Sequence, residues 1–425
     1  MLTKLLFLLC IPLLSATEYF VSPAGDDNHP GSREQPFATI NKGVHTLQGG
    51  DTLTILPGRY YEWVERRDLG VPDKTTLIRA AYPESVLLHG DLPCSGWTQV
   101  PGTQFTYCTD WKENVNAVNE RDTLKIFLPA GTLQDLEFKR ELWYYDRDAG
   151  KLYISTSDGL SPEQHLYSVS VLIGNGLFIQ NPVNVIIEGL MVSGFYSHYR
   201  VENRISSGLY GIRINHPQNS IVRNCRVFFN ANGIHSGHGD GGVLEDCVAY
   251  ANGSYNPSSG GNIVIWCPAK NGAIRNCLSF FSAKPGGRIG IRIYGGAAEN
   301  CLIENCMSFG EDAMGIKATN INSFCRNNYC DSGVHCVNSA NNTSGGVNAY
   351  NAKASDLRID KIPCQDWDKL FADPDNHDFR PQGNVAGLEN GIQDRGDVFF
   401  LSPLGNDSWD GRSVSSAWKS LRALP

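Results

Sequence analysis

Basic side chains recur two residues after a glycine in several short segments of the chain. The segments read "GIRIN", "GIHS", "GIRIY", "GIKA" and "GVHC". The residues at this position are Arg213, His235, Arg292, Lys317 and His335. If the segments are parallel strands about 4.8 Å apart, these side chains form a row on one outer face. The segment "GNIVIW" interrupts the row with Ile263 or, in a shifted register, with Val264 or Trp266.

A row of like charges is unfavourable unless an anion, a metal-bound acid or solvent compensates it. The plainer interpretation is a solvated face, because basic residues alternate with apolar ones on any exposed sheet. Polar turns beside the segments favour a binding site instead. "GFYSHYRVENR" precedes the first basic residue, "HSGHGDGG" runs on from the second, and "GEDAM" precedes Lys317.

The chemistry that such a row suits is β-elimination from a polymer of uronic acids. Cations neutralise the sugar carboxylate, so that the proton on the adjoining ring carbon becomes acidic and a base can remove it. Lys317 is the predicted base, because the fixed positive charge of Arg292, one coil earlier, favours a neutral amine. Arg292 is the predicted carboxylate clamp or acid. His235 completes the predicted catalytic set and, with Arg213, contacts the substrate.

Further substrate contacts are predicted in the polar turns and on the strands. They are His198, Tyr199, Arg200, His238, Trp266 and Tyr294. The first turn also offers Tyr196 and Arg204. Calcium is the one cofactor that the sequence suggests, and Asp240, Glu311 and Asp312 carry the carboxylates that would hold it.

Length and composition limit the class of protein. With 425 residues, 41% hydrophobic and 19% charged, the chain can bury a full core. Its net charge of −8 argues against a general nucleic-acid binder and gives no sign of attraction to a membrane surface. The local basic row could still bind an anionic ligand, for which the β-elimination chemistry above suggests an anionic polysaccharide, and the oligomeric state stays open.

The first residues predict export. Residues 1–16 combine one lysine, an apolar run and the small residues Ser15 and Ala16, which is typical of a cleaved secretory signal. No later run approaches the roughly 20 apolar residues that a membrane helix needs. We therefore expect a secreted, extracellular or periplasmic protein that starts near Thr17.

Four of the 13 cysteines occupy one repeated position. They end "IVRNC", "VLEDC", "AIRNC" and "LIENC" at Cys225, Cys247, Cys277 and Cys306. This spacing predicts one column of buried thiols, each acting as a small apolar residue. A disulfide is predicted instead between Cys94 and Cys108, which bracket a short loop.

The same four segments form an internal repeat, which is typical of a solenoid. Each has an apolar strand, an Asn or Asp before the cysteine, a short apolar run and then a strand that starts with glycine. No amphipathic helix lies between them. The pattern predicts an all-β parallel β-helix whose turns are supported by ladders of Asn side chains.

Two further segments carry a family resemblance. "YFVSPAGDDNHPGSREQPFATINKGV" and "GGDTLTILPGRYYE" resemble the entry of secreted right-handed parallel β-helix proteins of the pectin-lyase-like group. That group is rich in polysaccharide lyases, glycoside hydrolases and uronate epimerases. Lyases of this fold, including those similar to chondroitinase B and alginate lyases, use Lys and Arg on the helix, often with calcium held by acids. Here the order along the chain is Arg before Lys, and the sequence has no compact acidic cluster.

The resemblance implies a domain layout. Residues 17–390 form the β-helix domain, with an inserted β region at about 95–170 and regular coils over 171–340. "ELWYYDRDAGKLYISTSDG" resembles a small β insertion of the group. "FFLSPLGNDSWDGRSVSSAWKSL" repeats the entry motif, so we expect a second, truncated β-helix repeat at 397–425.

Two other function classes stay open. A glycoside hydrolase needs two carboxyl groups across the scissile bond, and Asp240 with Glu311 or Asp312, or Glu299 with Glu304, would supply them. "GHG" and "RI" resemble polygalacturonase motifs, but the paired upstream aspartates are absent. A non-catalytic carbohydrate-binding module would use Trp266 and Tyr294 as flat platforms for sugar rings.

Overall fold

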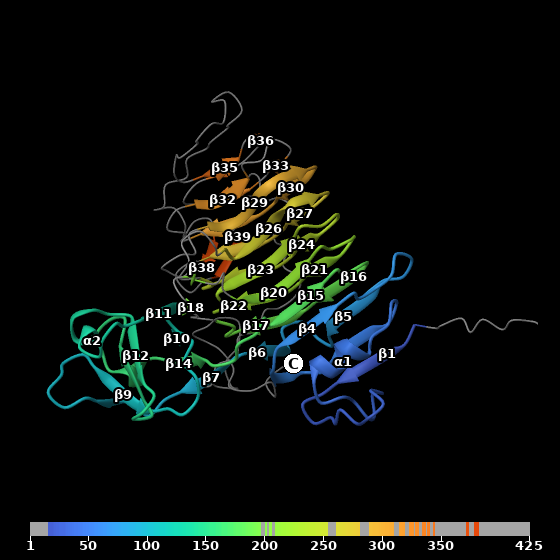
Figure 1. Ribbon diagram of the computed structural model, residues 1–425. Helices are drawn as coiled ribbons and strands as arrows, with labels where there is room; N and C mark the ends of the chain where they lie inside the picture. The colour runs from blue at the N-terminus through green and yellow to red at the C-terminus, as the bar shows by residue number, and fades with distance from the viewer. Residues whose placement is uncertain are drawn as a thin grey trace, which may run out of the picture.

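Three parallel sheets wind into a solenoid along most of the chain. The computed structural model describes residues 16–196, 209–253, 261–280, 289–309, 314–318, 323–326 and 328–330. It describes the backbone alone at residues 289, 309, 314 and 329 and in the strands 200–201, 204–205, 334–336, 338–340, 343–344, 371–373 and 378–381. Figure 1 shows the coils stacked from the blue N-terminal end to the orange end.

Each coil contributes one strand to each of three sheets, which we call sheets A, B and C. Sheet A has ten strands in the described chain: β1 (Glu18–Val21), β2 (Thr52–Ile55), β5 (Thr76–Ala80), β16 (Val185–Glu188), β21 (Ile221–Arg223), β24 (Val243–Glu245), β27 (Ala273–Arg275), β30 (Cys301–Glu304), β33 (Ser323–Arg326) and β36 (Asn338–Ala340). Sheet B has nine: β3 (Gly58–Tyr61), β6 (Val86–His89), β17 (Leu190–Ser193), β22 (Arg226–Phe228), β25 (Val248–Tyr250), β28 (Leu278–Phe280), β31 (Met307–Phe309), β34 (Tyr329–Cys330) and β37 (Thr343–Ser344). Sheet C has eight: β4 (Val64–Arg67), β15 (Leu177–Gln180), β20 (Tyr210–Asn215), β23 (Asn232–Gly237), β26 (Ile263–Lys270), β29 (Ile289–Glu299), β32 (Met314–Ala318) and β35 (Val334–Cys336).

This arrangement confirms the predicted right-handed parallel β-helix. Every neighbouring pair in the three sheets is parallel, because each coil returns the chain to the same direction one rung further on. Helix α1 (Ile40–Thr46) packs its buried Ile40 and Val44 into the first coils. Two further two-stranded sheets join β18 (Arg200–Val201) to β19 (Arg204–Ile205) and β38 (Phe371–Asp373) to β39 (Asp378–Pro381).

The core is the interior of the solenoid, where inward side chains stack in columns. Side chains alternate between the two faces of a strand, so every second residue of each strand points inward. One column of sheet A consists of Ile187, Val222, Leu244, Ile274, Ile303 and Cys325, all fully buried. Such stacking buries one rung against the next, so a solenoid of this kind gains its stability from neighbouring coils.

The turns from sheet A to sheet B repeat the same conformation. The residue before each column cysteine adopts a left-handed backbone with φ of 52° to 54°: Asn224, Asp246, Asn276 and Asn305. Asn and Asp tolerate this conformation better than other residues with a side chain. Asn276 donates to Asp246 at 3.2 Å and Asn305 donates to Asn276 at 3.3 Å, which confirms the predicted ladder of turn side chains.

The four repeated cysteines form the predicted column. Cys225, Cys247, Cys277 and Cys306 are buried and free. Hydrogen bonds join the Cys247 thiol to its neighbours Cys225 and Cys277, and the Cys277 thiol to Cys306. The column is therefore part of the core rather than a metal site or a set of disulfides.

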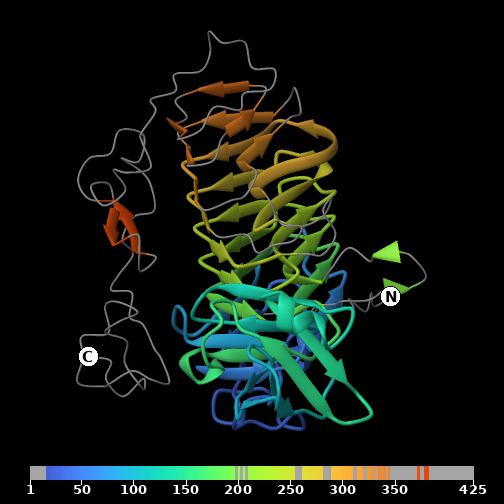
Figure 2. The same ribbon diagram turned by 90° about the vertical axis from the view of Figure 1, so that its left-hand side faces the viewer.

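An inserted sheet projects beside the first coils, as Figures 1 and 2 show in cyan and green. Its strands are β7 (Asp91–Cys94), β8 (Thr98–Gln99), β9 (Tyr107–Asp110), β10 (Ala117–Glu120), β11 (Lys125–Pro129), β12 (Leu142–Asp146), β13 (Lys151–Ser155) and β14 (Tyr167–Ser170), accompanied by helices α2 (Asp135–Phe138) and η1 (Pro162–Gln164). It has its own core around Trp97, Phe127 and Val169. The predicted inserted β subdomain is therefore present.

The predicted disulfide in this insertion is wrong, because Cys94 and Cys108 are both free. Cys94 packs in the core of the insertion. Cys108 lies on the other face of β9, since its neighbour Tyr107 packs on that core, and its sulfur is 3.7 Å from the Thr98 hydroxyl. A short loop brings the two strands near each other without directing the two thiols toward each other.

Thiol labelling should separate these two kinds of cysteine. We expect iodoacetamide to modify the half-exposed Cys108 in the native protein, because a reagent reaches a thiol only where solvent does. The four column cysteines should react only after denaturation. Peptide mapping by mass spectrometry reads out both. A linked Cys94–Cys108 peptide, or native labelling of the column, would contradict this structure.

In the described part of the chain, no helix has the length and apolar character needed to cross a membrane.

Candidate functional site

The basic residues of sheet C lie in one row. Arg213 pairs with His235, His235 with Val264 and Val264 with Arg292. Arg292 then pairs with Lys317, and Lys317 with the position of His335. The register thus assigns Val264 to the place that the segment "GNIVIW" left open. The core-facing neighbours Ile263 and Ile265 are buried in the solenoid, which directs Val264 to the outer face.

His235 is a buried imidazole between two cations. Its side chain is 2% exposed, and its ring packs edge-on against Tyr210 with centroids 4.5 Å apart. Burial, followed by the charges of Arg292 and Arg213, holds the pKa of His235 well below its usual 6.5. A hydrogen bond to the Gly261 backbone engages the ring, while Nε2 has no partner. The ring is therefore neutral near pH 7, with one nitrogen free to accept a hydrogen bond.

Arg292 is a buried guanidinium with unused donors. It is 4% exposed, and its guanidinium carbon lies 4.6 Å from the centre of the Tyr294 ring. Its Nε and Nη2 have no hydrogen-bond partner. These two nitrogens form one edge of the guanidinium, which is the edge that binds a carboxylate through two parallel hydrogen bonds.

Arg213 and Lys317 extend the row on either side. The Arg213 guanidinium lies 4.5 Å from the Tyr210 ring and 5.5 Å from the Phe178 ring, and it donates to Asn215 at 3.2 Å. Lys317 is half-buried on the rung after Arg292. Among the residues whose side chains the structure describes, no carboxylate forms an ion pair with Arg213, Arg292 or Lys317.

Sheet A gives the contrast within the same solenoid. Its outer row is Glu188, Arg223, Glu245, Arg275, Glu304 and Arg326. Acidic and basic residues alternate, so each charge has an opposite charge on the next rung. Arg223 bonds Glu188 at 2.6 Å, and Arg326 bonds Glu304 at 2.5 Å. The fold thus accommodates charged rows by pairing them, and sheet C departs from that rule where its cations are most buried.

The buried His235 should make stability depend on pH. Because folding disfavours its protonated form, the unfolded chain binds more protons below about pH 6.5, and stability falls as the pH decreases. One such group contributes at most about 1.4 kcal/mol per pH unit. We expect the free energy of unfolding, from urea denaturation between about pH 7 and pH 5, to fall more steeply for the native protein than for His235→Gln. If the free energy of unfolding had the same pH dependence in both proteins, the assignment of a neutral buried ring would be contradicted.

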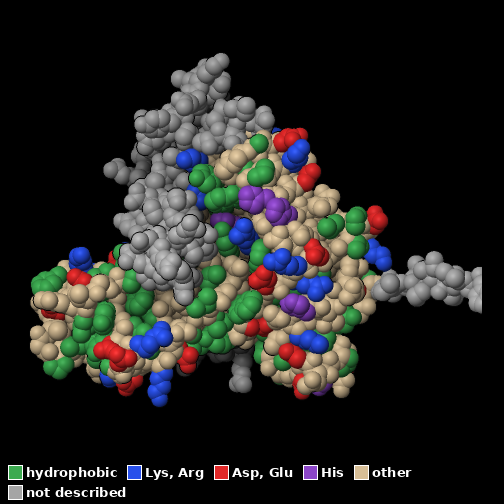
Figure 3. All heavy atoms as spheres, viewed as in Figure 1, with side chains coloured by type: hydrophobic (Ala, Val, Ile, Leu, Met, Phe, Trp, Pro, Cys, Tyr) green, Lys and Arg blue, Asp and Glu red, His purple; other side chains and the backbone are tan. Residues whose placement is uncertain are grey.

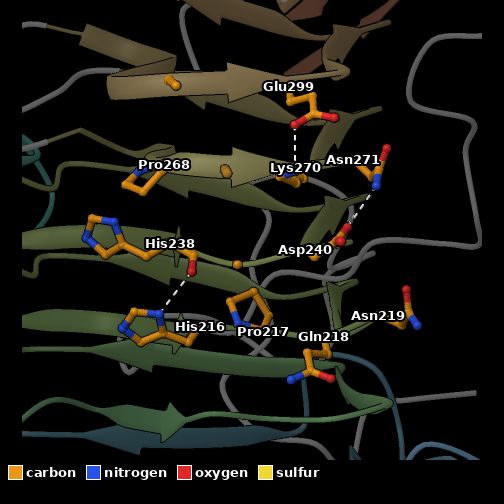
Figure 4. A pocket seen from close by; sticks show the side chains of 13 residues that line it. His216, Pro217, Gln218, Asn219, His238, Asp240, Pro268, Lys270, Asn271 and Glu299 are labelled. Atoms are coloured by element: carbon orange, nitrogen blue, oxygen red, sulfur yellow. Dashed lines mark hydrogen bonds and ion pairs between the residues drawn. The ribbon is translucent and has the colours of Figure 1, made fainter.

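A groove of about 860 Å³ opens beside the row, where sheet C turns toward sheet A. Two of its lining histidines come directly after β20 and β23, and histidine side chains gather on this surface (Figure 3). Figure 4 shows His216 and His238 on neighbouring rungs, with Pro268 beyond them. Asp240 and Asn271 lie across the groove from the two histidines, on the right in that view. The groove therefore has an apolar, ring-lined side and a polar side.

Several polar side chains of the groove are hydrogen-bonded or ion-paired to one another. Asn271 donates to Asp240 at 2.8 Å, and Asn300 donates to Asn271 at 2.8 Å. Lys270 bonds Glu299 at 2.7 Å. All of these side chains remain exposed, so their free oxygens and nitrogens face solvent.

Aromatic rings connect the groove to the basic row. The ring of Tyr294, which packs against Arg292, has its centroid 5.2 Å from that of Trp266. The centroids of the Trp266 and His238 rings are 6.4 Å apart. The centroids of the His238 and His216 rings are 5.6 Å apart. Burial, with smaller effects from His216 and Arg213, lowers the pKa of His238. The predicted contacts His238, Trp266 and Tyr294 thus lie on one continuous surface with Arg292.

Several predicted residues lie elsewhere. Tyr196 is fully buried in a hydrophobic cluster with Phe229 and Ala231, so its suggested place in the site is wrong. His198, Tyr199, Glu311 and Asp312 fall outside the described residues, as do the side chains of Arg200 and Arg204.

The proposed hydrolase carboxylates are engaged in pairs. Glu304 belongs to the ladder of sheet A, whereas Glu299 bonds Lys270 at the groove. In the sequence, Glu299 stood out only as such an acid, and His216 and Lys270 were not predicted as site residues. The signal for these residues was their common place at the end of a sheet C strand or just after it, where Gln218, Asp240 and Lys270 pair rung by rung.

Comparison with known proteins supports the fold and little beyond it. No protein-family model matches the chain. A stretch of 82 residues is 28% identical to the uncharacterized protein YwoF of Bacillus subtilis (strain 168), which is 19% of this chain and 18% of that protein. The match thus spans less than a fifth of that relative.

Solved structures resemble the chain over most of its length. A structure described as a glycoside hydrolase has a TM-score of 0.54 and 15% identity, over 77% of this chain and 85% of the other. Pectate lyase Pel9A has a TM-score of 0.47 and 14% identity, over 88% and 91%. The chain has the right-handed parallel β-helix fold that pectin-lyase-like polysaccharide lyases and glycoside hydrolases share.

Proposed function

We propose that this protein is a polysaccharide lyase that cleaves a polymer containing uronic acids by β-elimination. The observation that carries the proposal is the buried edge of Arg292, with Nε and Nη2 unpartnered in a row of cations. A buried unpaired cation is costly, and an anionic ligand offsets that cost. A uronate carboxylate has the charge and the planar two-oxygen geometry that this edge accepts.

Four residues of the row have a role in the proposed reaction. Arg292 binds the carboxylate and neutralises it, which acidifies the proton on the adjoining ring carbon. Lys317, on the next rung, removes that proton as the general base. The bond from the neighbouring ring carbon to the leaving oxygen breaks, a carbon–carbon double bond forms, and the leaving oxygen takes a proton from solvent. His235 accepts a hydrogen bond from a sugar hydroxyl at Nε2, and Arg213 holds a neighbouring acidic group.

Calcium stays a prediction in this scheme. Of its predicted ligands only Asp240 lies in the described residues, where it accepts a hydrogen bond from Asn271. The described residues contain no group of three His, Cys, Asp or Glu side chains suited to a metal ion.

The proposal is tested with the purified protein and a panel of pectate, alginate and glycosaminoglycans, each with calcium and with a chelator. Ultraviolet absorbance follows unsaturated uronates, and a reducing-sugar assay follows new chain ends. We expect both signals to rise together on at least one acidic polymer. New reducing ends without unsaturated product would overturn the proposal in favour of hydrolysis by carboxylates such as Asp240 and Glu299. If neither signal rises on any of the acidic polymers, the result would instead favour a carbohydrate-binding module.

A further inference from the structure

We infer that the substrate is a mixed polymer that carries uncharged sugars beside its uronates. The groove of His216, His238, Asp240 and Glu299 is the subsite that selects an uncharged sugar. This inference rests on the proposed function, since it takes the basic row as the place where a uronate binds.

A polymer that binds at the basic row can reach the groove along a series of neighbouring rings. Arg292, Tyr294, Trp266 and His238 follow one another with spacings of 4.6, 5.2 and 6.4 Å. Rings of this kind contact the apolar faces of sugars. At about 3.3 Å per residue along a strand and 4.8 Å per rung, the backbone of His238 lies on the order of 14 Å from that of Arg292. That separation suits sugars a few residues apart on one chain.

The charges of the groove are opposite to those of the row. Asp240 and Glu299 line it, while Lys270, the one lysine or arginine among the described residues that line it, is bound to Glu299 at 2.7 Å. With one cation for two carboxylates, the lining acids of the groove keep an excess of negative charge. A uronate placed here would meet like charge, which is unfavourable.

The groove is nevertheless equipped to bind sugar hydroxyls. Carboxylates accept two or more hydrogen bonds, and the exposed Asp240 and Glu299 each keep oxygens free for this purpose. The adjacent imidazoles and Pro268 offer an apolar floor for the carbon face of the ring (Figure 4). An uncharged sugar satisfies both sides of the groove without repulsion.

The test is a comparison of two oligosaccharides of equal length by isothermal titration calorimetry. One is oligogalacturonate, in which every sugar is a uronate, and the other is a hyaluronan fragment, in which glucuronate alternates with an uncharged sugar. Binding is measured on Lys317→Ala, so that neither ligand is cleaved. We expect the alternating ligand to bind about tenfold more tightly, as one like-charge contact would produce at intermediate dielectric. The double variant Asp240→Asn, Glu299→Gln should lose most of this preference by binding oligogalacturonate more tightly.

A matched control removes the same charges elsewhere. Asp68 accepts from Asn181 at 2.8 Å as Asp240 does from Asn271, and Glu141 bonds Lys125 at 3.0 Å as Glu299 does Lys270. Asp68→Asn with Glu141→Gln should leave the preference intact. Equal affinities for both ligands, or an unchanged preference in the groove variant, would overturn the inference while leaving a lyase intact. If neither ligand binds, the inference fails, and the cleavage assay on the full panel of acidic polymers decides the proposed function separately.

Discussion

Replacing Arg292 with methionine should stabilise the folded protein and remove its affinity for uronates at the same time. The Nε and Nη2 donors of this 4% exposed side chain have no partner, and an unsatisfied buried polar group costs about 1–3 kcal/mol. Methionine fills the space of the stem without the charge. We expect the free energy of unfolding to rise by about 1–3 kcal/mol in urea denaturation.

The loss of binding in this variant should be large. Removing one partner of a buried charge contact costs about 2–5 kcal/mol, which corresponds to about 30-fold to several thousand-fold in affinity. Arg223→Met is the matched control, since Arg223 lies in the paired row of sheet A and bonds Glu188 at 2.6 Å. It should lose about 0–1 kcal/mol of stability and keep full affinity. If Arg292→Met destabilises the protein as Arg223→Met does, the idea of an uncompensated cation is refuted.

Replacing Lys317 with alanine should remove most of the catalytic rate and little of the binding. A positioned general base contributes about 10²–10⁴-fold, so kcat should fall by that factor while KM stays within about threefold. The reason is that Lys317 acts on the proton in the transition state, whereas Arg292 holds the carboxylate throughout. Initial rates of unsaturated uronate formation measure both constants.

Lys317→Arg separates a base from a simple positive charge. Arginine keeps the charge but does not deprotonate, so this variant should be as slow as Lys317→Ala. Lys151→Ala is the control, because Lys151 forms an ion pair with Asp110 in the insertion, away from the row. A Lys317→Arg variant with near-native kcat would show that charge alone is needed and would remove Lys317 from its role as base.

Much of the solenoid could be predicted because its signals repeat. Asn276 and Cys277 recur in each coil at the same turn, and both follow from local chemistry: one tolerates a left-handed backbone, and the other fits a small buried space. The basic row was predictable for the same reason, since one residue in each glycine-led strand faces outward. The register of Val264 was not, because Ile263, Val264 and Ile265 are all apolar and alternation cannot choose between them.

Other features of the site depend on contacts between coils that no single segment records. Sequence alternation places His235 and Arg292 on the outer face but does not reveal that they are buried there. The groove forms because β26 and β29 extend past the other strands of sheet C and bring Lys270 and Glu299 together. The thiols of Cys94 and Cys108 are likewise close in sequence, but they belong to different faces of the insertion.

The mass of the cleavage products tests the account most directly. The purified protein is incubated with a defined oligosaccharide from the acidic polymer it degrades, and the masses of the products are measured by mass spectrometry. β-Elimination predicts product masses that sum to the mass of the substrate, with one unsaturated end, and no such products from Lys317→Ala. Product masses that exceed the substrate by one water, with cleavage retained in Lys317→Ala, would contradict the account and transfer the chemistry to the carboxylates.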